Sequence, residues 1–252
     1  MNLFAYLRLE LARAVRNIFQ ILFSILLPAF MFIVFGGTQD YKDVPVHDGN
    51  IAATIMIGMA LYGAVVNSTS IAASSAVEMS HGWGRQLRLT ALRPGQYALV
   101  KALTCLCLAA LPVATVFILG AFMGSKMPLS QWAATAFLAW ILSTVFSLYG
   151  LAIGMTFSSE AAPGIASGSL VLWAFLGNLF APLSGTLLDI GRLTPLYGIR
   201  GLAAYPVTRG DIPNGATMGN DPLWALILNT VAWVIILGAL AAAAFRRRAG
   251  RR

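Results

Sequence analysis

Apolar and polar residues follow one another along the chain in long blocks. The apolar runs number six and cover residues 18–35, 51–76, 97–123, 131–157, 164–182 and 222–245. Each is close to or above the length of about 20 residues that a helix needs to cross the hydrocarbon core of a bilayer. The pattern therefore predicts an all-α membrane protein with six transmembrane helices, forming a single transmembrane domain over residues 1–252.

Residues 1–17 show a different, amphipathic pattern. Its apolar positions fall on one stripe at helical spacing: Leu3, Phe4, Leu7, Leu11, Ala14 and Ile18. Arg8, Arg13 and Arg16 lie off this stripe, so we expect a helix in the membrane interface, with its apolar face in lipid and its arginines at anionic headgroups. A cleaved signal peptide is the alternative, but the next apolar run is too long and no clear cleavage site follows it.

The second apolar run changes character in its second half. Residues 67–76 read NSTSIAASSA and are almost all small or hydroxylated. Such residues let helices approach closely and form hydrogen bonds between helices. Two interpretations stay open, namely ordinary helix packing or the polar wall of a substrate path. The candidate wall residues are Asn67, Ser68, Ser70 and Asn178.

Composition excludes a soluble protein. Hydrophobic residues make up 58% of the chain and charged residues only 10%, whereas a soluble domain carries about 25% charged residues. The net charge of +8 does not indicate nucleic-acid binding, because the charges gather at the ends of apolar runs and in the tails.

The distribution of Lys and Arg predicts the orientation. Twelve of these residues fall on the side that holds both predicted termini, and five fall on the other side together with six Asp. By the positive-inside rule, both termini, the loop 78–96 and the basic tail 246–252 are cytoplasmic, and the segment 184–221 is extracytoplasmic.

Motifs for chemistry within this chain are absent. The sequence contains no phosphate-binding loop of the form G-x-x-x-x-G-K-[ST], no zinc motif and no G-x-S-x-G nucleophile motif. We therefore expect no catalytic residues, no metal site and no cofactor bound by this chain. No predicted span carries a charged residue near its centre, so ion-coupled transport is also disfavoured, and any transport must draw its energy from elsewhere.

The loop after the second apolar run carries the most specific motif. It combines an acid–glycine pair, a short basic segment and a turn that leads into the third run: Glu78 and Gly82; Arg85, Leu87 and Arg88; Thr90, Leu92, Pro94, Gln96, Tyr97 and Lys101. In order and spacing this loop motif resembles that of the membrane subunits of ATP-binding-cassette (ABC) exporters of the type-2 permease class. The blocks 26–28, 35–36, 179–182 and 194–197 resemble the same family, and residues 1–17 resemble its elbow helix.

The resemblance implies a function and partners. It implies a type-2 ABC exporter permease with six spans and an elbow helix, in the inner membrane of a prokaryotic cell, that pairs with a second membrane domain, either identical or related. A separate cytoplasmic ATPase would bind ATP and Mg and drive an amphipathic drug, lipid or glycan-linked lipid outward. Coupling to that ATPase would fall to Glu78, Gly82, Arg85, Leu87 and Arg88, although both arginines could instead be topology signals at the lipid surface.

Two other functions stay open at this point. A membrane-embedded lipid-modifying enzyme would have Ser184, Asp189 and Arg192 as its nearest candidate residues, but no histidine accompanies them. A non-transporting immunity or assembly subunit would share the same membrane architecture and partners.

Overall fold

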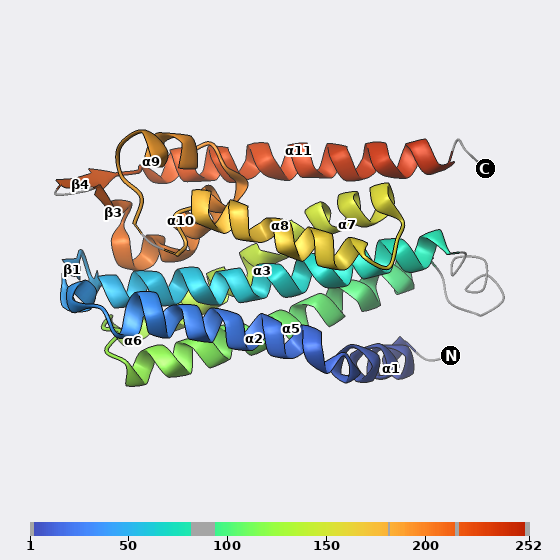
Figure 1. The fold of residues 1–252 in the computed structure, drawn as a ribbon, viewed down its shortest axis with the longest axis horizontal. Coiled ribbons are helices and arrows are strands. Elements are labelled where there is room, and N and C mark those ends of the chain that lie inside the picture. The colour runs from blue at the N-terminus through green and yellow to red at the C-terminus, as the bar shows by residue number, and fades with distance from the viewer. Residues whose placement is uncertain (1–2, 82–93, 181, 215–216, 250–252) are drawn as a thin grey trace.

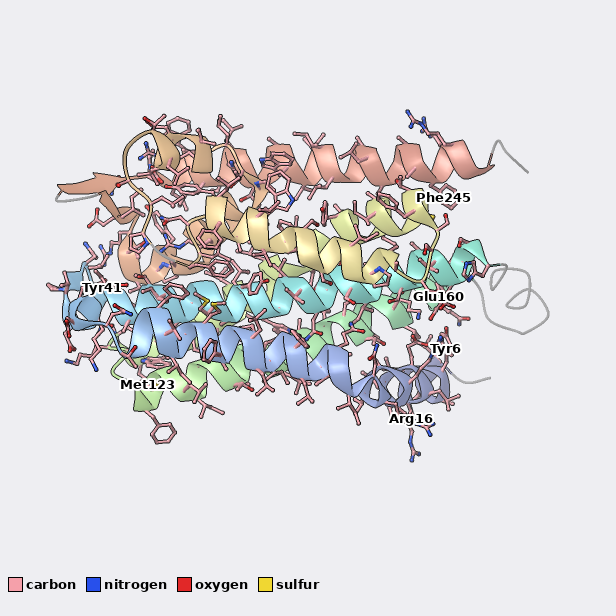
Figure 2. All side chains as sticks on the ribbon, in the orientation of Figure 1. Tyr6, Arg16, Tyr41, Met123, Glu160 and Phe245 are labelled. Atoms are coloured by element: carbon pink, nitrogen blue, oxygen red, sulfur yellow. The ribbon has the colours of Figure 1, made fainter. Side chains whose placement is uncertain are left out.

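The computed structural model describes residues 3–81, 94–180, 182–214 and 217–249. Its long helices run roughly parallel to one another in one bundle (Figure 1). Both chain ends lie at the same end of this bundle, which we call the terminal end. Figure 2 shows Tyr6, Glu160 and Phe245 towards the terminal end, and Tyr41 and Met123 towards the opposite end.

Helices make up most of the described chain. The helical elements are α1 (Leu3–Arg16), α2 (Ile18–Phe32), η1 (Ile33–Gly37), η2 (Asp40–Asp43), α3 (Ile51–Ser80), α5 (Pro94–Phe122), α6 (Leu129–Leu142), η3 (Ser143–Val145), α7 (Phe146–Phe157), α8 (Ala162–Leu176), α9 (Gly185–Gly191), α10 (Pro195–Thr208) and α11 (Leu223–Ala249). Two short antiparallel hairpins, at the end opposite the termini, pair β1 (Pro45–Val46) with β2 (Gly49–Asn50) and β3 (Asp211–Asn214) with β4 (Thr217–Asn220).

Five helical segments of the described chain are long and apolar enough to cross a membrane. They are Gln20–Gly37, Ile51–Ser80, Gly95–Phe122, Leu129–Phe157 and Leu223–Arg247. The fifth predicted run forms only the shorter apolar helix α8, which ends at Leu176. The backbone turns just after it, where Asn178 takes a left-handed φ of 61° that asparagine tolerates better than most residues. These helices support a multi-pass membrane protein, while a span formed by the run 164–182, and with it the total of six spans, stays a prediction.

Two predicted segment boundaries need correction. Glu78 still lies in the last turns of α3, and α5 already begins at Pro94, so helix takes up both ends of the predicted loop 78–96. Helix α11 continues to Ala249, so most of the predicted basic tail 246–252 is helical. Alanine and arginine are good helix formers, which allows the last helix to extend beyond its apolar part.

Helix α3 is the centre of the bundle. It is buried along almost its whole length and packs against α2, α5, α6, α7, α8 and α10. Gly63 lies where two neighbouring helices carry proline, because a Cβ there would be 2.6 Å from Pro112 Cβ and 2.9 Å from Pro28 Cγ. Helix α2 continues through Pro28 without a break, and it is followed by a π-helical segment at Ile33–Gly37.

Helices α3 and α7 pack closely against each other. A Cβ on Gly150 would collide with the carbonyl oxygen of Thr69, and one on Gly154 would collide with that of Ala73. The Thr69 hydroxyl also donates a hydrogen bond to the Phe146 carbonyl (3.3 Å). The small residues of 67–76 therefore support helix packing in this chain, as residues of this kind do in membranes.

Asn50 anchors the N-terminal end of α3. Its side-chain oxygen accepts hydrogen bonds from the backbone N–H of Ala53 (3.1 Å) and of Lys126 (2.9 Å), and its amide donates to the Gly124 carbonyl (2.8 Å). One residue thus caps α3 and holds the α5–α6 turn against it.

Candidate functional site

A cluster of charged side chains joins three helices at the terminal end. Lys101 of α5 lies between two carboxylates, forming an ion pair with Glu10 of α1 and another with Glu78 of α3 at 2.8 Å. Arg13 of α1 binds the second oxygen of Glu78, also at 2.8 Å. The Tyr97 hydroxyl donates a longer hydrogen bond to Glu78 (3.3 Å). We call these five residues the α1–α3–α5 charge cluster.

The charges in this cluster balance, with two carboxylates against one ammonium and one guanidinium. The Lys101 and Glu10 side chains are only 9% and 10% exposed, and that of Glu78 is 19% exposed, whereas Arg13 is 63% exposed. An ion pair shielded from water is strongly destabilised when one partner is removed, because the other charge stays behind without compensation. Lys101 is therefore the residue on which the cluster depends most.

Local packing explains why α1 presents Glu10 to the bundle. Tyr6 and Glu10, one helical turn apart, are the buried residues of α1. Leu3 and Leu7 pack with Tyr6 against Tyr97 of α5.

Part of the predicted apolar stripe of α1 packs against protein. Leu11 and Ala14 pack against a cluster of α3 and α5 side chains, as Leu3 and Leu7 do. Of the stripe's α1 residues, Phe4 is largely exposed, at 77%. An amphipathic pattern indicates that one face avoids water, but protein and lipid satisfy that requirement equally well.

The cluster flanks the predicted coupling segment. Glu78 lies just before residues 82–93 and Lys101 lies shortly after them. The predicted coupling residues Gly82, Arg85, Leu87 and Arg88 lie outside the described residues. Of the predicted coupling set, the structure therefore describes Glu78 alone, whose carboxylate contacts α1 and α5 within the chain.

The candidate path residues are buried and do not come together. Asn67, Ser68 and Ser70 are at most 4% exposed, and the Asn67 amide donates to the Leu108 carbonyl of α5 (3.0 Å). Asn178 accepts a hydrogen bond from the Leu183 N–H (2.8 Å).

Asn178 is separated from the other three candidates, as the packing of the next residue, Leu179, shows. The Leu179 carbonyl lies 3.0 Å from where a Cβ on Gly58 would be. Gly58 precedes Asn67 by nine residues on α3, which is about 14 Å along a helix. Asn178 is therefore far from the other three candidates, and the role of all four in a substrate path stays a prediction.

The residues considered for a lipid-modifying enzyme form a structural ion-pair cluster instead. Arg192 binds Asp189 and Asp221, each at 2.9 Å, while Ser184 is exposed at the start of α9. Burial raises the pKa of the Tyr197 hydroxyl, which donates a hydrogen bond to Asp221.

Arg200 completes this outer cluster. Arg200 is buried, and burial lowers the pKa of its guanidinium, against the opposing effect of Tyr197 and Asp221. No arrangement of nucleophile and base is evident among these described residues. Nor does the described part of the chain hold a group of three or more His, Cys, Asp or Glu side chains suited to a metal ion.

Sequence reasoning missed Glu10 as a functional candidate. The signal was present, because Glu10 is the one acidic residue of the N-terminal segment and lies three residues after Leu7 and four before Ala14 on the helical stripe. An acid on an otherwise apolar helix face indicates a basic partner on the surface that the face covers. The identity of that partner, 91 positions away, could not be read from periodicity.

Replacing Arg13 by glutamine should have a small effect on stability. Its side chain is 63% exposed, and Glu78 keeps its ion pair with Lys101. We expect the free energy of unfolding to fall by less than about 1 kcal/mol, as for most exposed pairs. Thermal unfolding of the purified protein in detergent checks this, and a loss as large as that of a Lys101 variant would show that Arg13 is as important as the buried pairs.

Comparison with known families identifies the membrane domain. The chain matches the family ABC2_membrane, described as ABC-2 type transporter, over residues 1–189, which is three quarters of its 252 residues. A search of curated proteins gives no match. The matched region includes all five residues of the charge cluster, and it runs from α1 into α9. The chain therefore belongs to the ABC-2 type transporter family and is a membrane-spanning permease component of an ABC transporter.

Proposed function

We propose that this chain is the permease subunit of an ATP-driven exporter, powered by a separate cytoplasmic ATPase that binds ATP and Mg. In this proposal α8 is the fifth of six spans, α1 is an elbow helix at the membrane interface, and the terminal end faces the cytoplasm of a prokaryotic cell. A second membrane domain, identical or related, completes the translocation unit. Family membership supports the general arrangement, since domains of this kind work with an ATPase and dimerise.

The observation that carries the coupling proposal is the α1–α3–α5 charge cluster. Glu78 and Lys101 lie on either side of residues 82–93 and bind each other, while Glu10 ties α1 to the same point. A force on the segment 82–93 would therefore reach α3, α5 and α1 together. Because α3 is packed against most other helices, its displacement is passed to the rest of the bundle.

This arrangement divides the coupling roles. We propose that Gly82, Arg85, Leu87 and Arg88 contact the ATPase, and that Glu78 transmits the movement through Lys101 and Arg13. Charged side chains that hold helix ends together suit this purpose, since an ion pair shielded from water keeps a defined geometry better than an exposed one.

The proposed substrate is an amphipathic solute, such as a drug, a lipid or a glycan-linked lipid, carried between the two membrane domains. Asn67, Ser68 and Ser70 could reach it only if helices next to α3 move apart, because these side chains are buried within this chain. Asn178, which follows α8, lies beside a different part of α3 and would contact a different part of the path.

Charge reversal in the loop tests the coupling. The double variant Arg85→Glu/Arg88→Glu, coexpressed with the proposed partner ATPase, should lose most of the ATPase that copurifies. ATP turnover of the reconstituted complex should fall at least about tenfold, the effect of losing about 1.4 kcal/mol of contact. Lys126→Met is the control, because Lys126 forms an exposed ion pair with Asp43 at the opposite end.

Three outcomes would contradict the proposal. If the wild-type protein never copurifies an ATPase, the proposed energy source would be missing. A complex that hydrolyses ATP equally well with and without the loop charges would show that Arg85 and Arg88 serve topology alone. ATP turnover that no amphipathic solute stimulates would favour the non-transporting assembly subunit.

A further inference from the structure

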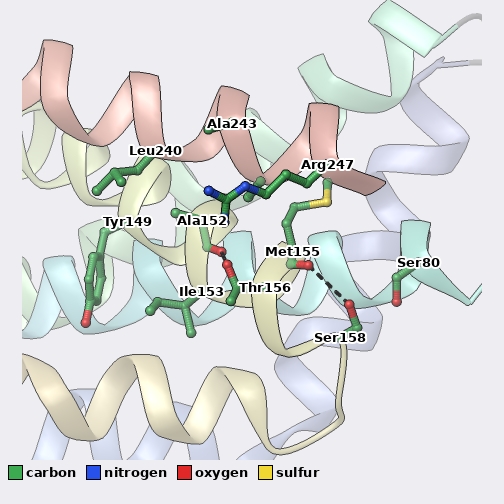
Figure 3. Close-up of a pocket in the computed structure, with 11 residues that line it drawn as sticks. Ser80, Tyr149, Ala152, Ile153, Met155, Thr156, Ser158, Leu240, Ala243 and Arg247 are labelled. Carbon is green, nitrogen blue, oxygen red and sulfur yellow. Dashed lines mark hydrogen bonds between the residues drawn. The ribbon is translucent and has the colours of Figure 1, made fainter. Parts of the chain in front are cut away.

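A cavity of about 730 Å³ opens between α3, α7 and α11 at the terminal end (Figure 3). Its walls are mostly apolar and include Ile153 of α7 together with Leu240 and Ala243 of α11. Its polar lining includes Thr156 and Arg247. The volume is within the range of about 300–1,000 Å³ that is typical of ligand pockets.

Arg247 points into this cavity. Figure 3 shows its side chain running back along α11 over the cavity, with the guanidinium on the side of Ala152. Within the described residues no carboxylate forms an ion pair with Arg247, since the basic partners of all nine ion pairs are other residues. Arg247 is exposed, so its guanidinium is accessible to a ligand, and a basic side chain near the membrane surface attracts anionic lipid headgroups.

The hydroxyl groups of the lining define the rest of the ligand. Thr156 donates its hydrogen to the Ala152 carbonyl (2.7 Å), and Ser80 donates its hydrogen to the Val77 carbonyl (2.6 Å). Both oxygens therefore remain only as acceptors. The site offers the Arg247 guanidinium as a donor for an anion, hydroxyl oxygens as acceptors for hydroxyl groups and an apolar surface for a hydrocarbon chain.

We propose that this cavity binds an anionic phospholipid with a hydroxyl-bearing headgroup, of the phosphatidylglycerol type. The phosphate binds Arg247, headgroup hydroxyls donate to Thr156 and Ser80, and an acyl chain lies along Leu240 and Ile153. A small soluble anion would leave the apolar walls unused. A zwitterionic lipid such as phosphatidylcholine has no net charge to balance Arg247 and no headgroup hydroxyl to donate.

The site is separate from the coupling proposal, although the two are neighbours. Ser80 follows Glu78 by two residues at the end of α3, so a bound lipid would contact the same helix end as the charge cluster. Binding of the lipid requires neither the ATPase nor transport, and it can be measured on this chain alone.

Native mass spectrometry in detergent tests the proposal. The purified protein, titrated with phosphatidylglycerol or phosphatidylcholine of the same acyl chains, should bind the anionic lipid roughly tenfold more tightly at one site. Arg247→Gln should reduce this preference to less than about twofold. Arg246→Gln is the matched control, because Arg246 is adjacent, carries the same charge and does not line the cavity; it should keep the preference.

A second variant separates the site from general effects of charge. Ala243→Phe keeps Arg247 but fills part of the cavity, and it should lower binding of phosphatidylglycerol at least about fivefold while leaving thermal unfolding without lipid unchanged. Equal losses in both arginine variants would overturn the proposal in favour of nonspecific attraction. Displacement of the lipid by glycerol phosphate would assign the site to soluble phosphate esters, and a change from dimer to monomer in Arg247→Gln without any change in lipid binding would assign it to a second copy of this chain.

Discussion

Replacing Lys101 by methionine should lower the free energy of unfolding by about 3 kcal/mol. Methionine keeps most of the length of the side chain but removes the ammonium between Glu10 and Glu78. Glu10 has no other ion pair among the described residues, so its carboxylate would stay almost buried and uncompensated. Thermal or denaturant unfolding in detergent measures the loss, and coupled ATP turnover of the complex should fall with it.

Two further variants serve as comparisons for Lys101→Met. Lys126→Met removes an ion pair whose side chains are 72% and 53% exposed, and it should change stability by less than about 1 kcal/mol. The double variant Glu10→Gln/Lys101→Met removes both charges of one pair and should recover a substantial part of the stability. A loss in Lys101→Met no greater than in Lys126→Met would mean that the charge cluster contributes little to holding α1, α3 and α5 together.

Replacing Gly150 by valine should destabilise the bundle by about 3 kcal/mol or more. The first side-chain carbon would collide with the Thr69 carbonyl oxygen, which is backbone and cannot turn away. Helices α3 and α7 would have to separate, and α3 is the helix on which most of the others pack. The thermal unfolding midpoint and the yield of monodisperse protein in detergent both report this change.

Gly168→Val is the matched control for this glycine. Gly168 also lies within a helix, α8, but a Cβ there would meet no atom within 4 Å. Valine is a better helix former than glycine, so the control should be neutral or slightly stabilising. Equal destabilisation by both substitutions would show that Gly150 acts through the helix itself and not through contact with α3.

Much of the secondary structure followed from hydrophobic pattern alone. Runs of 18 or more apolar residues have few alternatives to a membrane-spanning helix, because no other open structure satisfies the backbone polar groups within lipid. Five of the six predicted runs accordingly form helices of sufficient length. The remaining run, 164–182, forms a helix that ends at Leu176, before the turn at Asn178. The Leu179 backbone then lies against Gly58 of α3, a contact between distant segments that hydropathy does not report.

The candidate site was only partly predictable. Glu78 stood out because it is an acid within a basic segment, and the resemblance around it assigned it a coupling role. Its contacts with Arg13 and Lys101 could not be foreseen, because they join helices that lie 65 and 23 positions away from it. Periodicity describes which face of a helix avoids water, but not which other helix covers that face.

The loop after the second apolar run illustrates the division most clearly. Composition and local order were enough to predict a membrane protein with a basic segment between its second and third spans, because these properties do not depend on how the helices pack. The packing of the helices, in contrast, brings Glu78 and Lys101 into an ion pair, adds Glu10 of α1 to them, and places Arg247 at a cavity where no carboxylate of the described residues pairs with it. Such pairings are set by the packing of distant helices, and the energies that select them arise only when those helices meet.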